Sequence, residues 1–337
     1  MLPLPPVVAE RILSVAPGSF RGMSALTYEI KDPRSPVAVW LRERFPHHRE
    51  VQTAFRAGAG PILVPPPAGA VLGTQGGAID WWLRFLIDPA PRLELALAGL
   101  TRHRGRPFVK PGLRLLAQVG VIEPGSATVA AMDPTRVADL PDEWWARLSY
   151  ALALLVEGAR MAPAGVEHSR LMLLSPPSSP RELLDLCTDA EVADLIAMRD
   201  LARERLLPAL PPGPVHTGMT FEGSHDLNAD ADLIAAGVLV DFKASQGGNP
   251  RQNGTRAASL PHADLDQLLG YALMDYSDAF ALHSLAIYST RFGYLASWPI
   301  DQLTAQLAGG PLDLALLRRE FANILKVELP AYWSQKR

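Results

Sequence analysis

The clearest alternation of apolar and polar positions in the chain lies between residues 228 and 243. In Val238–Lys243 the even-numbered residues are apolar, and the odd-numbered ones end with Asp241 and Lys243. The segment Asn228–Ile234 alternates in the same way. Alternation with a period of two residues predicts a strand with one apolar face. The residues Ala235–Gly237 between the two segments predict the turn of a hairpin.

The pairing of these two strands decides whether their charged residues meet. A turn of two or four residues centred on Ala236-Gly237 places Asp232 opposite Asp241. The same register places Asp230 opposite Lys243, so that all four side chains share one face. A turn of three residues would shift the pairing by one position and separate the two acids. The hydrophobic pattern favours the first register, because a slip would mix apolar and polar side chains on each face.

The remaining pattern predicts a chain in two parts. Residues 1–175 combine irregular stretches with helical ones, of which Pro141–Met161 has the clearest apolar stripe. From about residue 178 the sequence predicts a helix to Leu207, and then further strands and helices in alternation. The additional strands are expected at Val215–Phe221, Leu282–Thr290 and Gly293–Trp298, and a helix at Pro261–Tyr276. We therefore expect a mixed α/β (α+β) fold, with a mainly helical N-terminal region of unknown role at 1–175 and an α/β domain at 178–337.

The composition narrows the class of protein. Of the 337 residues, 48% are hydrophobic and 20% are charged, which excludes intrinsic disorder over most of the chain. Apolar runs such as Ala151–Val156 are far shorter than the roughly 20 residues of a membrane span, so we expect no membrane partner. The net charge of −3 gives no general attraction to nucleic acid, and any such contact must come from local patches.

Two further features concern the compartment. The first residues, MLPLPPVVAER, have no basic region before an apolar run, so we expect no signal peptide. The single cysteine, Cys187, excludes an internal disulfide and a thiolate metal cluster. These features predict a cytoplasmic protein.

The charged face of the predicted hairpin carries the candidate chemistry. Carboxylates that face each other in a sheet repel unless a positive charge lies between them, and Mg²⁺ binds one or two carboxylates together with waters. A lysine two residues along the strand can stabilise developing negative charge. The set outlines a site for metal-assisted hydrolysis of a phosphodiester bond. The alternative is a salt-bridge ladder on a solvated sheet face. The apolar surroundings of Val238–Lys243 favour the site, because buried unpaired charges are costly.

A second motif follows the hairpin. Gln267 and Tyr271 are four residues apart in the predicted helix, so they share one helix face. The pattern Asp232-x(8)-Asp241-x-Lys243, preceded by a helix and followed by a Gln-x-x-x-Tyr helix, resembles the PD-(D/E)XK nuclease superfamily and its RecB-like branch. The resemblance covers roughly the last 160 residues. It implies a restriction-endonuclease-like core with a mixed central sheet, and a metal-dependent nuclease that acts on DNA in defence or repair.

The resemblance also implies a role for each matching residue. Asp232, Asp241 and the backbone carbonyl of Phe242 would bind Mg²⁺ or Mn²⁺, and Lys243 would position the attacking water. Gln267 and Tyr271 would brace the site or touch the nucleic-acid backbone. The chain departs from the RecB-like pattern in having no clear counterpart of the upstream histidine. The upstream acid of the superfamily has four candidates, between which the sequence does not choose: Glu191, Asp194, Glu204 and Glu222.

Two basic segments are candidates for contact with phosphates. The loop Ser245–Leu260 carries Arg251 and Arg256 without an acid, and it joins the motif strand to the Gln/Tyr helix. The run Arg102–Arg114 is the densest basic segment of the chain. A rival hypothesis is a catalytically inactive nuclease fold that binds nucleic acid or a protein partner, the latter through the N-terminal region. The motifs leave open whether the substrate is DNA or RNA, and which strandedness it has.

Overall fold

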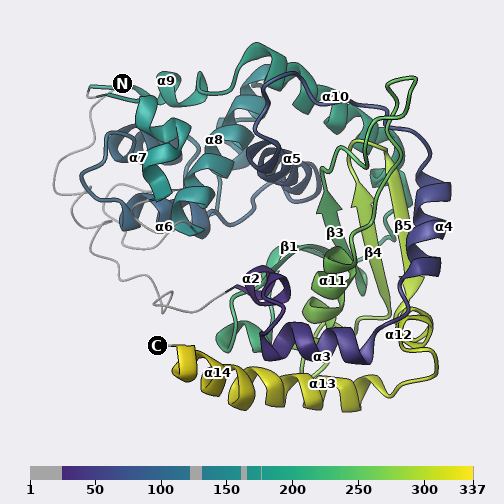
Figure 1. Cartoon of the computed structure of the whole chain (residues 1–337). Coiled ribbons are helices and arrows are strands. Elements are labelled where there is room, and N and C mark those ends of the chain that lie inside the picture. The colour runs from purple at the N-terminus through teal and green to yellow at the C-terminus, as the bar shows by residue number, and fades with distance from the viewer. Residues whose placement is uncertain (1–24, 122–130, 161–164, 176, 337) are drawn as a thin grey trace. The chain divides into compact units, whose positions relative to one another are not determined.

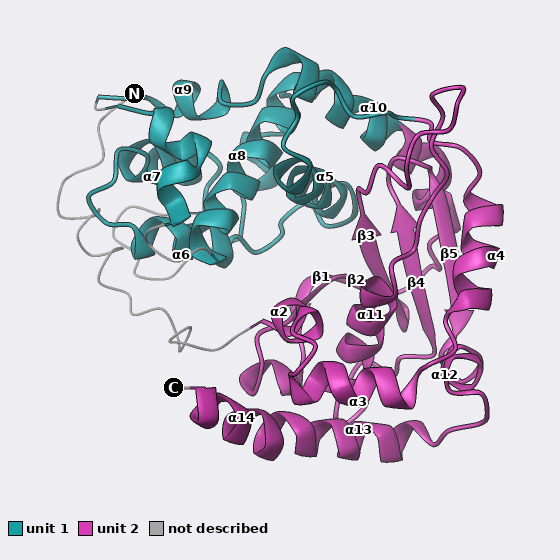
Figure 2. Cartoon of the chain, viewed as in Figure 1, with its two compact units in different colours: residues 1–20, 64–200 teal, residues 21–63, 201–337 magenta. Residues whose placement is uncertain are grey.

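A computed structural model describes residues 25–121, 131–160, 165–175 and 177–336. The first residues, on which the expectation of no signal peptide rests, lie outside these ranges. The chain divides into two compact units, drawn in two colours in Figure 2. Unit 1 consists of residues 1–20 and 64–200, and unit 2 consists of residues 21–63 and 201–337. This division differs from the expected one at residues 175–178: the chain leaves unit 2 after residue 63 and returns to it after residue 200.

Unit 2 contains a five-stranded sheet of the order β1-β2-β3-β4-β5 (Figure 1). Neighbouring strands are antiparallel, except that β3 and β4 are parallel. A parallel pair needs a long crossover, which the loop after β3 and helix α11 supply. The strands are β1 (Val215–Thr220), β2 (Asp230–Ala235), β3 (Val238–Lys243), β4 (Ser284–Ser289) and β5 (Tyr294–Pro299), and α11 is His262–Met274. The expected mixed sheet, combined with a helical N-terminal region, is confirmed.

The β2–β3 hairpin has the predicted register. Leu233 pairs with Val240, and the two strands are joined by the two residues Ala236 and Gly237. Their φ angles of 45° and 82° are the left-handed values of a type I′ turn, whose twist matches that of the strands. A Cβ atom on Gly237 would lie 2.9 Å from the carbonyl oxygen of Ala281, so this position also requires a residue without a side chain.

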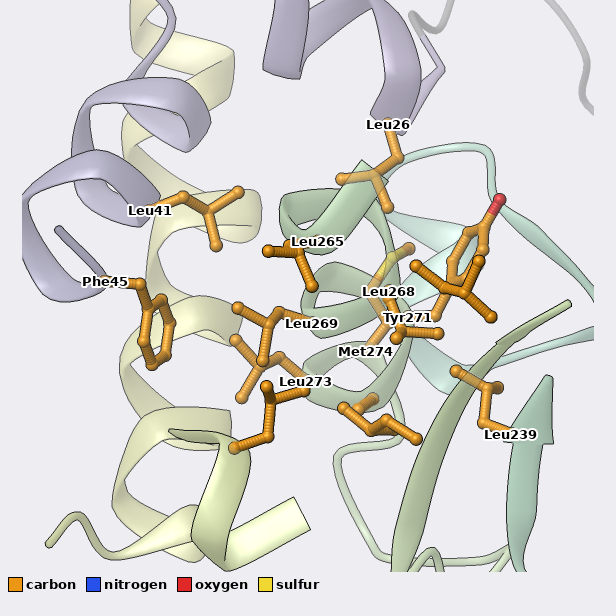
Figure 3. Packing of buried hydrophobic residues seen from close by; sticks show 14 of the residues in the cluster. Leu26, Leu41, Phe45, Leu239, Leu265, Leu268, Leu269, Tyr271, Leu273 and Met274 are labelled. Carbon is orange, nitrogen blue, oxygen red and sulfur yellow. The ribbon is translucent and has the colours of Figure 1, made fainter. Parts of the chain in front are cut away.

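Helix α11 lies at the centre of the hydrophobic core of unit 2. Figure 3 shows Leu265 and Leu269 of α11 beside Leu41 and Phe45, which come from the N-terminal part of the chain. The approach is close at Gly270, where a Cβ atom would lie 2.8 Å from a methyl carbon of Leu26. This packing explains why residues 21–63 belong to unit 2 although 137 residues of unit 1, numbers 64–200, separate them from its other part.

Helices at both ends of the chain complete unit 2. Helices α2 and α13 pack against α11, whereas α4 and α12 pack against β5 (Figure 1). Asp32, which follows α2, accepts hydrogen bonds from the Tyr332 hydroxyl at 2.8 Å and the Lys336 ammonium at 2.6 Å in α14. The helices are α2 (Leu26–Lys31), α3 (Pro36–Arg44), α4 (Arg49–Ala59), α12 (Ile300–Ala308), α13 (Leu314–Asn323), a π-helical turn (Ile324–Glu328) and α14 (Leu329–Lys336).

Unit 1 is helical in its described part. Helix α8 packs against α5 and α6, and Gly99 of α6 lies directly on the backbone of Leu155 in α8. None of the helices in the described part of the chain is both long enough and apolar enough to cross a membrane. The helices are α5 (Leu72–Ile87), α6 (Glu94–Arg102), α7 (Val109–Gln118), α8 (Asp142–Arg160), α9 (Pro180–Leu184) and α10 (Asp189–Arg205), whose last turn enters unit 2. Short 3₁₀ turns lie at Pro134–Arg136, Gly165–His168 and Arg170–Leu173 in unit 1, and at Leu207–Ala209 and Glu222–His225 in unit 2.

Candidate functional site

The hairpin brings Asp232, Asp241 and Lys243 together on one face of the sheet. The observed register, continued by one residue, sets Asp232 across from Asp241. Oδ2 of Asp232 accepts a hydrogen bond of 2.7 Å from the backbone N–H of Phe242, which holds this carboxylate against β3. The Lys243 ammonium lies 2.7 Å from Oδ2 of Asp241. The geometry that the alternation of residues predicted for these three side chains is therefore present.

The site lies at the edge of the hydrophobic core. Asp241 is 2% exposed, and its partner in β4 is the fully buried Ile287. Two residues before Asp241 in β3, Leu239 on the same face packs under α11 (Figure 3). Asp241 is therefore desolvated because its face of the sheet continues into the core, which is the surrounding predicted from the apolar residues of the strand.

Burial sets the electrostatics of the ion pair. Loss of hydration raises the pKa of Asp241; the ammonium of Lys243 acts in the opposite direction, and the charge of Asp232 adds to the rise. Burial alone would lower the pKa of Lys243, but Asp241 and Asp264 together hold it above its ordinary value. The neighbouring acids therefore favour the charged form of Lys243, and the ammonium in turn favours the charged form of Asp241.

Helix α11 contributes the remaining polar groups of the site. Oε1 of Gln267 accepts a hydrogen bond of 2.9 Å from Lys243, and Nε2 of Gln267 donates to the hydroxyl of Tyr271. Tyr271 is buried, and its pKa is raised first by burial and then by the charges of Asp241, Asp230 and Asp232. The two residues of the Gln-x-x-x-Tyr motif thus reach the same cluster of acids.

Asp264 also belongs to this cluster, although it was not predicted from the sequence. Its Oδ1 lies 3.6 Å from the Lys243 ammonium. A signal was available, because Asp264 precedes Gln267 by three residues and Tyr271 by seven, which is the spacing of one helix face. The four upstream candidates have partners elsewhere: Arg170 for Glu191, Gln75 for Asp194, Arg205 for Glu204 and the backbone of Ser277 for Glu222.

The loop between β3 and α11 places its two arginines differently. The guanidinium of Arg256 donates a hydrogen bond of 2.7 Å to the carbonyl oxygen of Gly248 and so closes the loop on itself. The Arg251 side chain is exposed. The start of the loop is fixed next to the site, since the buried Arg291 donates to the carbonyl oxygen of Ala244 at 3.0 Å. Contact of Arg251 and Arg256 with nucleic acid stays a prediction.

The residues present fit a hard divalent cation with a small protein ligand set. Oδ2 of Asp241 is buried and, although Lys243 is at ion-pair distance, it accepts no hydrogen bond of regular geometry from any described residue. Two carboxylates and the carbonyl of Phe242 are the oxygen ligands that Mg²⁺ accepts with waters in its other positions. In the described ranges there is no group of three or more His, Cys, Asp or Glu side chains that could hold a metal ion.

Along the chain, the elements from α10 to β4 are a helix, three antiparallel strands, a crossover helix and a parallel strand. Asp241 and Lys243 lie at the carboxyl end of β3, where the crossover to α11 begins. Comparison of the chain with protein-family models, with curated proteins and with solved structures found no match.

Proposed function

We propose that this protein is a metal-dependent nuclease that hydrolyses phosphodiester bonds in DNA. One observation carries the proposal: Asp232, Asp241 and Lys243 meet on one sheet face, and Gln267 and Tyr271 face them from α11. The order of elements from α10 to β4 is the order expected of a PD-(D/E)XK core, and it supports the same function.

The residues of the site would have separate roles in hydrolysis. Asp232, Asp241 and the carbonyl of Phe242 would hold Mg²⁺ or Mn²⁺. Such a cation, when bound, polarises a phosphoryl oxygen and lowers the pKa of water. Lys243 remains protonated and stabilises the negative charge that grows on the phosphate as water attacks and the bond to the leaving oxygen breaks.

The residues of α11 would keep this lysine in place. Gln267 accepts a hydrogen bond from the Lys243 ammonium, and Tyr271 in turn orients the amide of Gln267. A lysine has four rotatable side-chain bonds, so fixing its ammonium removes an entropic cost from the reaction.

The test is cleavage of DNA by the purified chain with Mg²⁺ or Mn²⁺, compared with the same reaction in excess chelator. Asp241→Asn should lower the cleavage rate by at least about 100-fold, the size of effect that a lost group in an electrostatic site has. Asp301→Asn is the matched control, since Asp301 is exposed on α12. Cleavage that persists in chelator, or in Asp241→Asn, would show that the nuclease activity does not come from this site.

A second candidate function is a catalytically inactive nuclease fold that binds nucleic acid. It is favoured by the ion pair itself, because Lys243 already neutralises Asp241 without a metal. Such a module would bind DNA with the same affinity in Mg²⁺ and in chelator, and it would leave linear and circular DNA intact. A binding measurement by fluorescence anisotropy beside the cleavage assay separates the two functions.

A further inference from the structure

The ammonium of Lys243 has more negative charge around it than the predicted motif supplies. Three groups lie close to it: Oδ2 of Asp241 at 2.7 Å, Oε1 of Gln267 at 2.9 Å and Oδ1 of Asp264 at 3.6 Å. Two of these three groups come from α11 and one comes from the hairpin. The side chain of Lys243 is 20% exposed, so water screens only weakly the attraction between its ammonium and each anion beside it.

The two carboxylates at ion-pair distance from Lys243 have different roles in the proposed function. Asp241 is a ligand in the proposed function, and an oxygen that binds a divalent cation cannot at the same time hold the ammonium closely. Gln267 is neutral and cannot replace the lost charge. A buried ammonium without an anion is costly. Asp264 lies at ion-pair distance from Lys243 on the α11 side, so it can stay with the ammonium while Asp241 is engaged.

The position of Asp264 in its helix supports a role beyond local stability. It is the third residue of α11, where an acid commonly stabilises a helix through the dipole or a capping hydrogen bond. No side chain caps this helix, whose N-cap residue is Pro261, and the carboxylate of Asp264 points to Lys243 instead. Asp266, two residues further on, lies 3.4 Å from His262 and so belongs to a different side of α11.

We propose that Asp264 is a positioning residue that holds the Lys243 ammonium on the α11 side of the site, so that Asp241 is free to bind the cation. This inference rests on the proposed function. Asp264 acts only through Lys243: it is neither a ligand of the cation nor a group that touches the DNA.

The first measurement is Mn²⁺ binding without DNA, by calorimetry, in the full chain. In Asp264→Asn, Lys243 loses one of the two carboxylates at ion-pair distance and competes harder for Asp241, so the Kd for Mn²⁺ should rise about tenfold, which is a typical coupling between contacting charges. Asp264→Glu keeps the charge and should restore most of the affinity. Asp301→Asn, on the exposed face of α12, should bind Mn²⁺ like the wild type.

A double-mutant cycle tests whether Asp264 acts through the lysine. In the Lys243→Met background, replacing Asp264 with Asn should leave the Mn²⁺ affinity unchanged, because no ammonium competes for Asp241. An equal loss in both backgrounds would show that Asp264 attracts the cation directly, and it would overturn the inference. So would an Asp264→Asn variant that binds Mn²⁺ as tightly as the wild type.

Cleavage kinetics give an independent readout. The single-turnover rate of Asp264→Asn should fall by about 10-fold or more while the affinity for DNA in Ca²⁺ stays the same, since the residue positions a group that acts in the transition state. A wild-type chain that binds no Mn²⁺ and cleaves nothing would overturn the proposed function and this inference with it. A wild type that binds and cleaves, beside an Asp264→Asn variant that does both equally well, would overturn the inference alone.

Discussion

The ion pair of Asp241 and Lys243 leads to a prediction about stability that needs no metal. In Lys243→Met the flexible side chain of methionine fills a similar space, but Asp241 loses the cation 2.7 Å away. A buried charge that loses its partner typically costs about 3–5 kcal/mol. Asp241 is 2% exposed, so little of this cost is relieved by water.

The cost should depend on pH in a defined direction. Burial already raises the pKa of Asp241 in the folded chain, and removing Lys243 removes the main influence that opposes the rise. For an acid whose folded pKa lies above its unfolded value, the folded state is favoured at low pH, and stability is lost as the pH rises. The loss in Lys243→Met should therefore be about 1 kcal/mol or less at pH 5 and about 3–5 kcal/mol at pH 8.5.

The assay is urea denaturation in chelator at both pH values, followed by circular dichroism. Pulsed hydrogen exchange on peptides from β2 and β3 assigns the transition to unit 2. Lys31→Met is the matched control, because Lys31 is exposed at the end of α2. Combining Lys243→Met with Asp241→Asn should recover most of the stability at pH 8.5. An equal loss at the two pH values would show that the charge of Asp241 does not cause it, and no loss at either would show that Asp241 is hydrated. Both results would refute the buried ion pair.

Three other predictions concern separate parts of the chain. Burial raises the pKa of Asp266 to about 6 although His48 opposes the rise, so stability is lost as the pH rises from the ordinary value of about 4 to about 6. Urea denaturation should therefore find Asp266→Asn about 1–3 kcal/mol more stable than the wild type at pH 8 and equally stable at pH 4. Gly99→Ala should destabilise unit 1 by about 3 kcal/mol or more in thermal unfolding, because its Cβ atom would lie 1.9 Å from the carbonyl oxygen of Leu155. Replacing both Arg251 and Arg256 with Ala should lower the salt dependence of DNA binding by about one to two units in a log–log plot, whereas lines of equal slope would show that the loop does not touch phosphates.

The hairpin and its charged face could be predicted from the sequence because both depend on residues that are close together in the chain. Side chains alternate between the two faces of a strand, so the order of residues assigns Asp232, Asp241 and Lys243 to faces before any packing is known. The turn then sets the register, since Ala236 and Gly237 adopt the left-handed angles that a two-residue connection needs. The helix spacing of Gln267 and Tyr271 is local in the same sense.

The tertiary structure decided which separate segments meet. Asp264 reaches Lys243 only because the crossover turns α11 back over β3, and the sequence spacing of the two residues does not contain that turn. The N-terminal helices join unit 2 because Leu26 and Phe45 bury apolar surface in the same core as α11, across a separation that no local pattern records. Burial against distant segments is a property of the whole folded chain, whereas strand faces and helix faces are properties of a few consecutive residues.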